Sequence, residues 1–260
     1  MKKRNDQNVI VKRAVLVFIL MFLVLLAALA FFTRSIVMRE QLKASYTAEA
    51  TVANVEAQLN RYLAESGLLK NIVESGYEIS DSDFAALSKL MYNEDGIIKA
   101  VELAPNGVVR SVYPQAGNAD VLGLNMLRHP ERKVEANLAK ESGQYTIAGP
   151  FQLVQGGTGA LLFDPIYTTG ADGSQKYWGF SVLVLDWESF LDEIQINKLQ
   201  DASYEYLIWK EGHNGERIVI AQGDRPVGPN TLELPCAVPN VTWFFQIRPD
   251  TGWITPTQEA

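Results

Sequence analysis

The longest uninterrupted apolar run lies near the N-terminus, from Ala14 to Phe32, and it contains no charged side chain. A helix over these residues would span roughly 30 Å at about 1.5 Å per residue, which matches the hydrocarbon thickness of a bilayer. A cleaved signal peptide is the alternative, but its apolar core would be shorter, roughly 7 to 15 residues. The pattern therefore predicts a transmembrane helix over residues 14–32, in contact with membrane lipid.

A basic tail precedes this run, because residues 1–13 carry five Lys or Arg side chains. By the positive-inside rule, such a tail stays cytoplasmic and the chain from residue 33 onward crosses the membrane. We expect a single-pass protein of the plasma (inner) membrane whose bulk is periplasmic or extracellular. A final segment, residues 254–260, would be a juxtamembrane or truncated tail.

A helical pattern continues beyond the membrane segment and predicts a stalk helix over residues 33–77. Its apolar side chains recur at alternating spacings of four and three, which is typical of a coiled-coil seam. We expect the part near the membrane to form a homodimer, and the C-terminal half to pack on its own domain, where Leu68, Ile72 and Tyr77 widen the apolar face. The seam consists of Ala48, Val52, Val55, Leu59, Tyr62, Ser66, Leu69 and Val73.

A membrane-distal lobe is expected over residues 78–185. Ser80 and Asp83 have the spacing of a capping box, which opens a short helix that ends before Gly96. Two strand patterns flank Asn106-Gly107, a pair that suits a tight hairpin turn. The expected elements are strands over 97–104 and 108–113, a helix over 130–142, and strands over 145–154, 159–168 and 177–185.

A smaller, membrane-proximal lobe is expected over residues 186–253. It opens with a helix at Asp186-Trp187-Glu188 that runs towards Lys198. Strand patterns follow at 204–210, 217–222, 232–238 and 241–248. The sequence therefore predicts an α+β fold in which a transmembrane helix and a long stalk helix precede two antiparallel-sheet lobes in tandem.

Charge and cysteine content narrow the classes of partner and site. The net charge is −7, and 18 basic and 29 acidic side chains remain beyond residue 32. This acidic balance argues against a nucleic-acid partner. Cys236 is the only cysteine, so neither an intramolecular disulfide nor a cysteine-based metal cluster can form.

Residues typical of catalysis are scarce in this sequence. The two histidines, His129 and His213, lie in polar loop contexts without the spacing of a hydrolytic triad. The glycine-rich stretch 155–159 lacks the G-K-[ST] ending of a phosphate-binding loop and fits a hairpin turn. Acidic residues such as Asp164 and Asp186 are spread over a strand and a solvated helix face, without metal-ligand spacing. We therefore predict no enzymatic activity, no cofactor and no metal site.

A series of short motifs, in order and at consistent spacing, resembles the CHASE family. This family is the extracytoplasmic sensory domain found ahead of histidine kinases, diguanylate cyclases and adenylate cyclases. The similarity covers roughly residues 45–253 and ends on a closing pattern at Pro239-Asn240 and Gly252-Trp253. The motifs are Val112-Tyr113-Pro114, Leu122-Gly123-Leu124-Asn125, Pro130-Glu131-Arg132, Ile147-Ala148-Gly149-Pro150-Phe151-Gln152-Leu153, Gln155-Gly156-Gly157, Pro165-Ile166-Tyr167 and Trp178-Gly179-Phe180.

The resemblance implies two PAS-like lobes, a ligand in the distal lobe, and dimerisation along the long helix. Plant members of the family place an acidic, ligand-binding side chain where this chain has Asn125, and an apolar side chain at Ile147. Asn carries no charge, so the ligand need not be cytokinin-like; a turn-stabilising role for Asn125 is the alternative. The ligand-binding residues expected from this comparison are Asn125, Leu127, Ile147, Phe163, Tyr177 and Ser181.

The sequence therefore predicts a CHASE-type sensor that binds a small molecule and transmits the signal across the membrane. An output kinase or cyclase domain would lie beyond Ala260 if this sequence is a fragment of a longer receptor. The alternative is a stand-alone sensor that signals through a partner. The alternative is a membrane-anchored scaffold that binds a protein partner and no small molecule; a filled distal core would favour it.

Overall fold

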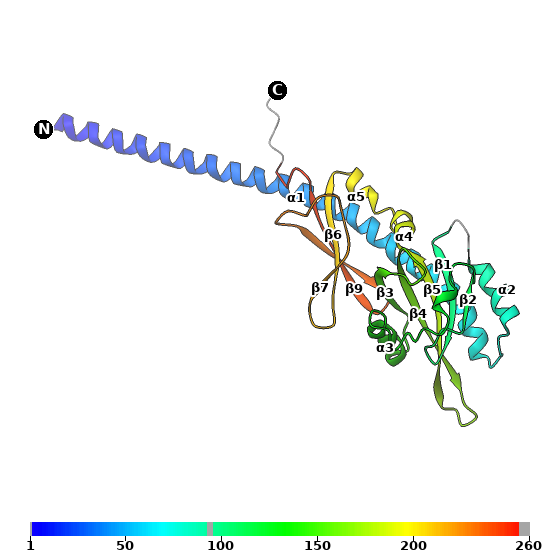
Figure 1. The fold of residues 1–260 in the computed structure, drawn as a ribbon. Coiled ribbons are helices and arrows are strands. Elements are labelled where there is room, and N and C mark those ends of the chain that lie inside the picture. Colours follow the sequence, from blue (N-terminus) through cyan, green and yellow to red (C-terminus); the bar gives the residue numbers. More distant parts are fainter. Residues whose placement is uncertain (1, 93–95, 255–260) are drawn as a thin grey trace.

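The computed structural model describes the backbone of residues 2–92 and 96–254, and side chains from residue 12 onward. The first helix, α1, runs without interruption from Lys2 to Glu74 and forms one long rod (Figure 1). The predicted membrane and stalk helices are therefore two parts of one helix. The side chains of the basic tail before Lys12, and residues 255–260 of the expected tail, lie outside the described residues.

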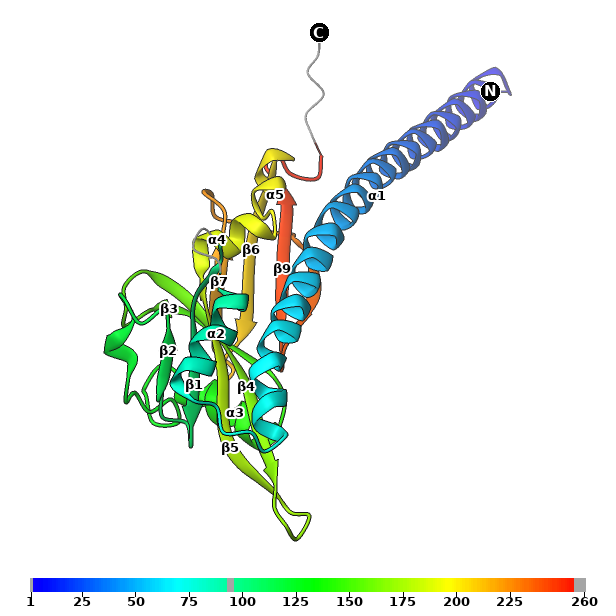
Figure 2. The same cartoon turned by 90° about the vertical axis from the view of Figure 1, so that its right-hand side faces the viewer.

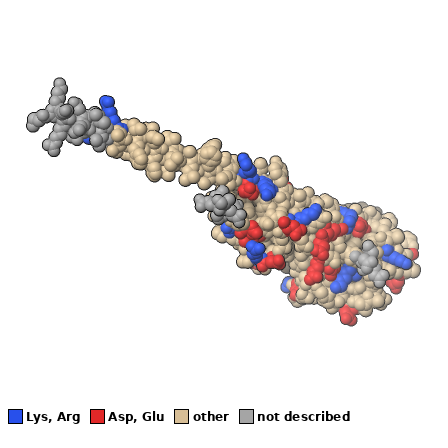
Figure 3. All heavy atoms as spheres, turned by 90° about the horizontal axis from the view of Figure 1, so that it is seen from above, with Lys and Arg blue, Asp and Glu red and all other residues tan. Residues whose placement is uncertain are grey.

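The segment of α1 over residues 14–32 projects away from the rest of the protein. Its side chains are almost all exposed, among them Phe18 at 71% and Phe31 at 70%. Figure 3 shows this segment as an uncharged surface between groups of Lys and Arg side chains. It is long and apolar enough to cross a membrane. The projecting apolar surface fits a membrane anchor, because lipid would cover side chains that the protein leaves bare.

The C-terminal half of α1 lies along both sheets (Figures 1 and 2). From Ala48 to Val73, the predicted seam is buried within the chain, and Val52 is its one half-buried member. The expectation that the membrane-near part of this seam pairs with a second copy is therefore wrong. Helix-on-helix and helix-on-sheet packing both require apolar side chains at spacings of three and four, and here the sheets cover them.

The distal sheet has five antiparallel strands in the order β2-β1-β5-β4-β3. The predicted hairpin is confirmed, with Asn106 and Gly107 at φ values of 53° and 78° in its turn. Its second strand is shorter than predicted, because Val108 bridges to Asn125 before the strand begins. The strands are β1 (Ile98–Pro105), β2 (Ser111–Tyr113), β3 (Thr146–Gln152), β4 (Thr158–Thr169) and β5 (Gln175–Asp186).

Short helices cover this sheet. Helix α2 (Asp81–Met91) begins at the predicted capping box, in which Ser80 and Asp83 exchange side-chain to backbone hydrogen bonds. A single 3₁₀ turn, η1 (Ala119–Val121), lies in the loop after β2. Helix α3 (Lys133–Ser142) begins three residues later than predicted and ends at Gly143, whose φ of 68° suits glycine.

The proximal sheet has four antiparallel strands in the order β7-β6-β9-β8. The single helix predicted before it is two helices, α4 (Trp187–Glu193) and α5 (Asn197–Asp201), which separate at Gln195 with a φ of 57°. Ile194 and Ile196 are both buried. A continuous helix would place these two side chains on nearly opposite faces, so the break lets both enter the core. The strands are β6 (Tyr204–Glu211), β7 (Arg217–Gln222), β8 (Leu232–Val238) and β9 (Val241–Pro249).

Candidate ligand-binding site

The distal sheet has two buried faces that carry different side chains. On β5, Leu183 and Leu185 belong to the core shared with α1, whereas Val182 and Val184 belong to the core under α3. We call these the α1 face and the α3 face. The apolar floor of the α3 face consists of Ala100, Ala104, Ala148, Leu161, Phe163, Phe180, Val182 and Val184.

Helix α3 and the loop over residues 114–132, which follows β2, cover the α3 face. Ala136 and Ala139 point from α3 towards the sheet, and their small side chains let the helix backbone approach closely. Met126 contributes a fully buried side chain from the loop. Residues 114–142 therefore form a lid of one loop and one short helix over an apolar floor.

An acidic side chain is buried within this apolar floor. Glu102 on β1 is 1% exposed and lies opposite Val182 in the register of β1 and β5. Burial raises the pKa of Glu102 from 4.5 to about 7, although the positive charge of Arg132 opposes the rise. Its Oε2 has no hydrogen-bond partner among the described residues.

Arg132, just before α3, is buried to the same extent, at 1% exposed. Its guanidinium lies 5.5 Å from the centre of the Phe151 ring, and its Nη1 is 3.7 Å from Sδ of Met126. Burial lowers the pKa of Arg132, while Glu102 raises it. The Nε of Arg132 has no partner in the described part of the chain. Glu102 and Arg132 therefore act on each other through space, and each keeps unused hydrogen-bonding capacity.

Two uncharged side chains add further unpaired polar atoms. The Asn125 Oδ1 is buried and has no partner in residues 12–92 and 96–254, and the same holds for the Tyr177 hydroxyl. The Tyr177 ring packs edge-on against Phe180, with a centroid distance of 5.3 Å, and the Lys140 ammonium lies 4.9 Å from its centre. Burial raises the pKa of Tyr177, so the phenol stays protonated and can donate.

Unpaired polar atoms are unusual inside a protein core. Each costs roughly 1 to 3 kcal/mol when it is cut off from water without a partner. Four such atoms lie on the α3 face or in its cover, from Glu102, Asn125, Arg132 and Tyr177. Two of these atoms, on Glu102 and Asn125, are acceptors, and the two on Arg132 and Tyr177 are potential donors.

The six ligand-binding residues expected from the sequence divide between the two faces. Four of them lie on the α3 face or in its cover: Asn125, Leu127, Phe163 and Tyr177. Ile147 lies opposite Leu162 on the α1 face, and Ser181 lies opposite Asp164, which contacts α1. A site confined to the α3 face would therefore not include Ile147 and Ser181.

Two polar residues of the α3 face, Glu102 and Arg132, were not expected from the sequence. Glu102 carried a signal, because it is the one acid in the otherwise apolar second half of strand 97–104. Acidic side chains are almost never fully buried unless they are paired. Arg132 carried a weaker signal, its place in the Pro130-Glu131-Arg132 motif.

The residues considered for catalysis are explained by local structure. The His129 Nδ1 accepts a hydrogen bond from the Glu131 amide at 3.3 Å, and His213 lies in the loop between β6 and β7. The glycine-rich stretch 155–159 is the predicted hairpin turn, here between β3 and β4. Asp164, the acid that the sequence placed on a strand, is buried against α1. No group of acidic, histidine or cysteine side chains in the described residues has the arrangement of a metal site.

A solved structure shares this architecture at low sequence identity. An extracellular ligand binding receptor from Desulfohalobium retbaense DSM5692 aligns with a TM-score of 0.51 and 13% identity. The alignment covers 82% of this chain and 39% of the receptor, so this chain spans well under half of the receptor's length. The periplasmic domain of Vibrio cholerae LuxQ aligns with a TM-score of 0.35 and 12% identity, over 76% of this chain and 96% of that domain. At such identities the likeness concerns the fold alone.

Sequence comparison identifies the family. No curated protein matches the chain. A family model described as the CHASE domain matches residues 47–220, which is more than half of the chain. The range begins inside α1 and ends in β7, so it includes the motifs from Val112 to Phe180 and excludes those at Pro239-Asn240 and Gly252-Trp253. The chain belongs to the CHASE domain family, whose members are sensory domains.

Proposed function

We propose that this chain is the extracytoplasmic sensor of a membrane receptor and that it binds a small molecule on the α3 face of the distal lobe. The observation that carries the proposal is the set of four buried, unpaired polar atoms, from Glu102, Asn125, Arg132 and Tyr177, on or over that face. In this account the basic N-terminal tail is cytoplasmic, and both lobes lie outside the membrane.

The ligand's chemistry follows from these four groups. The Glu102 carboxyl and the Asn125 Oδ1 can accept hydrogen bonds, whereas Arg132 Nε and the Tyr177 hydroxyl can donate them. The surrounding side chains are apolar. The ligand therefore has donors and acceptors on a compact apolar body, as in an amide or a heterocycle with ring nitrogens. Because Met126 and Phe163 are fully buried, the ligand enters when the lid over residues 114–142 moves away from the sheet.

A scaffold that binds only a protein partner is the second candidate. The filled core under α3, with Met126 and Phe163 fully buried, favours it. The unpaired atoms of Glu102 and Arg132 favour the sensor, because a purely structural core would gain stability from apolar residues at these positions.

The route to the membrane is α1 itself. The helix packs against both sheets through one continuous apolar core and then extends into the apolar segment. A ligand that favours one packing of the distal sheet on α1 over another shifts the equilibrium between them, and α1 carries the difference to the membrane. The output that receives this signal belongs to the longer receptor or to a partner.

The ligand test is a thermal-melting screen of the full chain in lipid nanodiscs against a broad metabolite panel. We expect at least one uncharged or zwitterionic compound to raise the melting temperature of the wild type. Tyr177→Phe, which removes only the hydroxyl, should weaken that compound's binding about five-fold. Tyr113→Phe, on the edge strand β2, is the control and should bind as the wild type does. A panel without any stabilising compound would leave the scaffold as the better account.

A homodimer along α1 is proposed on a different surface from the predicted seam. Between the membrane segment and the lobes, α1 exposes Ile36, Met38, Leu42 and Tyr46. Leu42→Cys should therefore form a disulfide-linked dimer under mild oxidation in membranes. Val55→Cys, which is buried against the sheets, should stay monomeric, as should the wild type with its buried Cys236. Equal cross-linking of the two variants would contradict a dimer through residues 36–46.

A further inference from the structure

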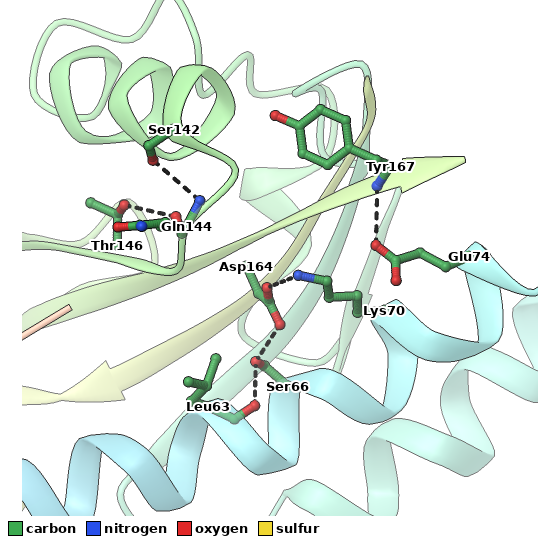
Figure 4. Close-up of polar contacts among 9 residues, drawn as sticks. All are labelled: Leu63, Ser66, Lys70, Glu74, Ser142, Gln144, Thr146, Asp164 and Tyr167. Atoms are coloured by element: carbon green, nitrogen blue, oxygen red, sulfur yellow. Dashed lines mark hydrogen bonds and ion pairs between the residues drawn. The ribbon is translucent and has the colours of Figure 1, made fainter. Parts of the chain in front are cut away.

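A second group of polar side chains lies on the opposite, α1 face of the distal sheet. Asp164 on β4 is 1% exposed and accepts two hydrogen bonds from α1, one from Ser66 at 2.9 Å and one from Lys70 at 2.9 Å (Figure 4). Ser66 is the polar interruption of the apolar seam. The interruption therefore has a partner, and it joins the last turns of α1 to β4 of the distal sheet.

Two hydroxyl groups beside this contact have no partner. Ser181 lies directly opposite Asp164 on β5 and is fully buried. Thr146 lies opposite Phe163, and continuing that register by one residue places Tyr145 opposite Asp164. Tyr145 is 7% exposed. Neither the Tyr145 nor the Ser181 hydroxyl has a hydrogen-bond partner among the described residues.

A groove of about 550 Å³ opens onto this group at the place where α1 and the two lobes meet. Tyr145, Lys70 and Asp164 lie at its polar part, and Leu59, Leu63, Val238 and Pro239 supply apolar walls. Its rim is held in place by Asn240, from the turn between β8 and β9, which donates hydrogen bonds to Ser142 at 3.0 Å and Thr146 at 2.9 Å. Figure 4 shows Ser142, Gln144 and Thr146 above the Asp164 contact. The groove has the size of a small-molecule site.

The polar part of the groove offers donors and has no free carboxylate. Both Asp164 oxygens already accept hydrogen bonds, from Ser66 and Lys70. Lys70 has three N–H donors and uses one on Asp164, and Tyr145 can donate its hydroxyl proton. Burial raises the pKa of Tyr145, with Asp164, Tyr62 and Glu65 adding to the rise, so the phenol is neutral. An occupant must therefore bring acceptor atoms.

The charges in the groove select an uncharged occupant. Lys70 and Asp164 neutralise each other, and Glu56 at the other end accepts a hydrogen bond from the Ala237 amide at 3.1 Å. An anion would lie beside the negative charges of Asp164 and Glu65. A cation would lie beside the Lys70 ammonium, whose charge already balances that of Asp164. We infer that this groove is a second binding site, for an uncharged small molecule with a hydrogen-bond-acceptor oxygen on a short apolar body.

The site is independent of the α3 face, since the sheet separates the two. Its occupant would contact α1, the distal lobe and the proximal lobe at once. Binding there would stabilise the packing of both lobes on α1, the same packing through which a signal reaches the membrane.

The test uses three probes that share one alkyl chain and differ in head-group charge: butanamide, butyrate and butylammonium. Binding to the full chain in nanodiscs is measured by saturation-transfer NMR, with empty nanodiscs subtracted. We expect butanamide to bind more tightly than either ion. Tyr145→Phe should weaken butanamide binding about five-fold, because one hydrogen bond is lost. Ala237→Trp, at an exposed position on the groove wall, should abolish it while leaving the fold intact.

Tyr177→Phe is the matched control, because it removes the unpaired hydroxyl on the other face of the same sheet and should leave butanamide binding unchanged. Tighter binding of either ion, no binding of any probe, or unchanged butanamide binding in Tyr145→Phe and Ala237→Trp would overturn the inference. Loss of binding in Tyr177→Phe alone would also overturn it, and would place the probe on the α3 face. None of these results would decide whether the α3 face binds its own ligand.

Discussion

The stability of the wild type should fall by about 3 kcal/mol between pH 4.5 and pH 8 relative to that of Glu102→Gln. The cause is the pKa of Glu102, which burial raises from 4.5 to about 7 in the folded protein. Below pH 4.5 the carboxyl is protonated in both the folded and the unfolded chain, so its burial requires no change of protonation and the free energy of unfolding is at its highest. As the pH rises to about 7, the unfolded chain loses this proton first. Folding must then either take up a proton or bury a charged carboxylate, and the free energy of unfolding falls.

Urea unfolding of both proteins across this pH range, followed by tryptophan fluorescence, measures the difference. Glu102→Gln keeps the shape of the side chain and cannot ionise, so its own pH profile reports all other groups. Asp120→Asn, at an exposed position in η1, is the control and should follow the wild type. Parallel profiles for the wild type and Glu102→Gln would mean that Glu102 is not buried in the way described.

The second large effect concerns α1. Leu59→Ala should destabilise the full chain by about 2 to 5 kcal/mol, because Leu59 is 1% exposed in the core that joins α1 to both sheets. Trp187 and Trp243 lie in this core with their rings 6.1 Å apart, so tryptophan fluorescence reports its loss directly.

The matched control is Leu90→Ala on α2, where the side chain is 77% exposed, and it should change the stability by less than about 0.5 kcal/mol. A small, equal effect of both substitutions would show that α1 is not part of the folded core. Loss of only one lobe in Leu59→Ala would show that the lobes fold separately.

The sequence patterns predicted the elements better than their packing. The capping box at Ser80 and the Asn106-Gly107 turn depend on neighbouring residues, and both were predicted correctly. The seam on α1 was assigned the wrong partner for its membrane-near part, because its spacing is the same whether a helix or a sheet covers it. The break at Gln195 was missed, since no proline or glycine marks it.

Ser181 shows why part of the site could not be predicted. In a regular strand, Tyr177 and Ser181 would lie on the same face, since side chains alternate. The register of β4 and β5 shifts between Ile166 and Tyr167, so that Trp178 has no opposite residue. Tyr177 therefore shares the α3 face with Phe180, and Ser181 falls on the other face. A bulge is a tertiary feature that alternation within one strand does not reveal.

The burial of two acidic residues was also not predicted from the sequence. Glu102 and Asp164 both lie in apolar strands, and the partners of each are visible only when the neighbouring strand and helix are placed. Asp164 accepts hydrogen bonds from Ser66 and Lys70 on α1, about one hundred residues away in the sequence. Glu102 interacts with Arg132 through the electrostatic attraction of their charges. Which acid is hydrogen-bonded to protein groups and which has an unpaired oxygen depends on these distant partners.

The most direct test of the sensing account is amide hydrogen exchange of the full chain in nanodiscs, with and without a stabilising compound from the metabolite panel. The account predicts slower exchange in the loop over residues 114–132 and in α3, because a ligand on the α3 face closes this lid. Protection confined to residues 56–70 and 237–240 would place the compound in the groove beside α1. Such a pattern, or unchanged exchange in the lid, would contradict ligand sensing on the α3 face.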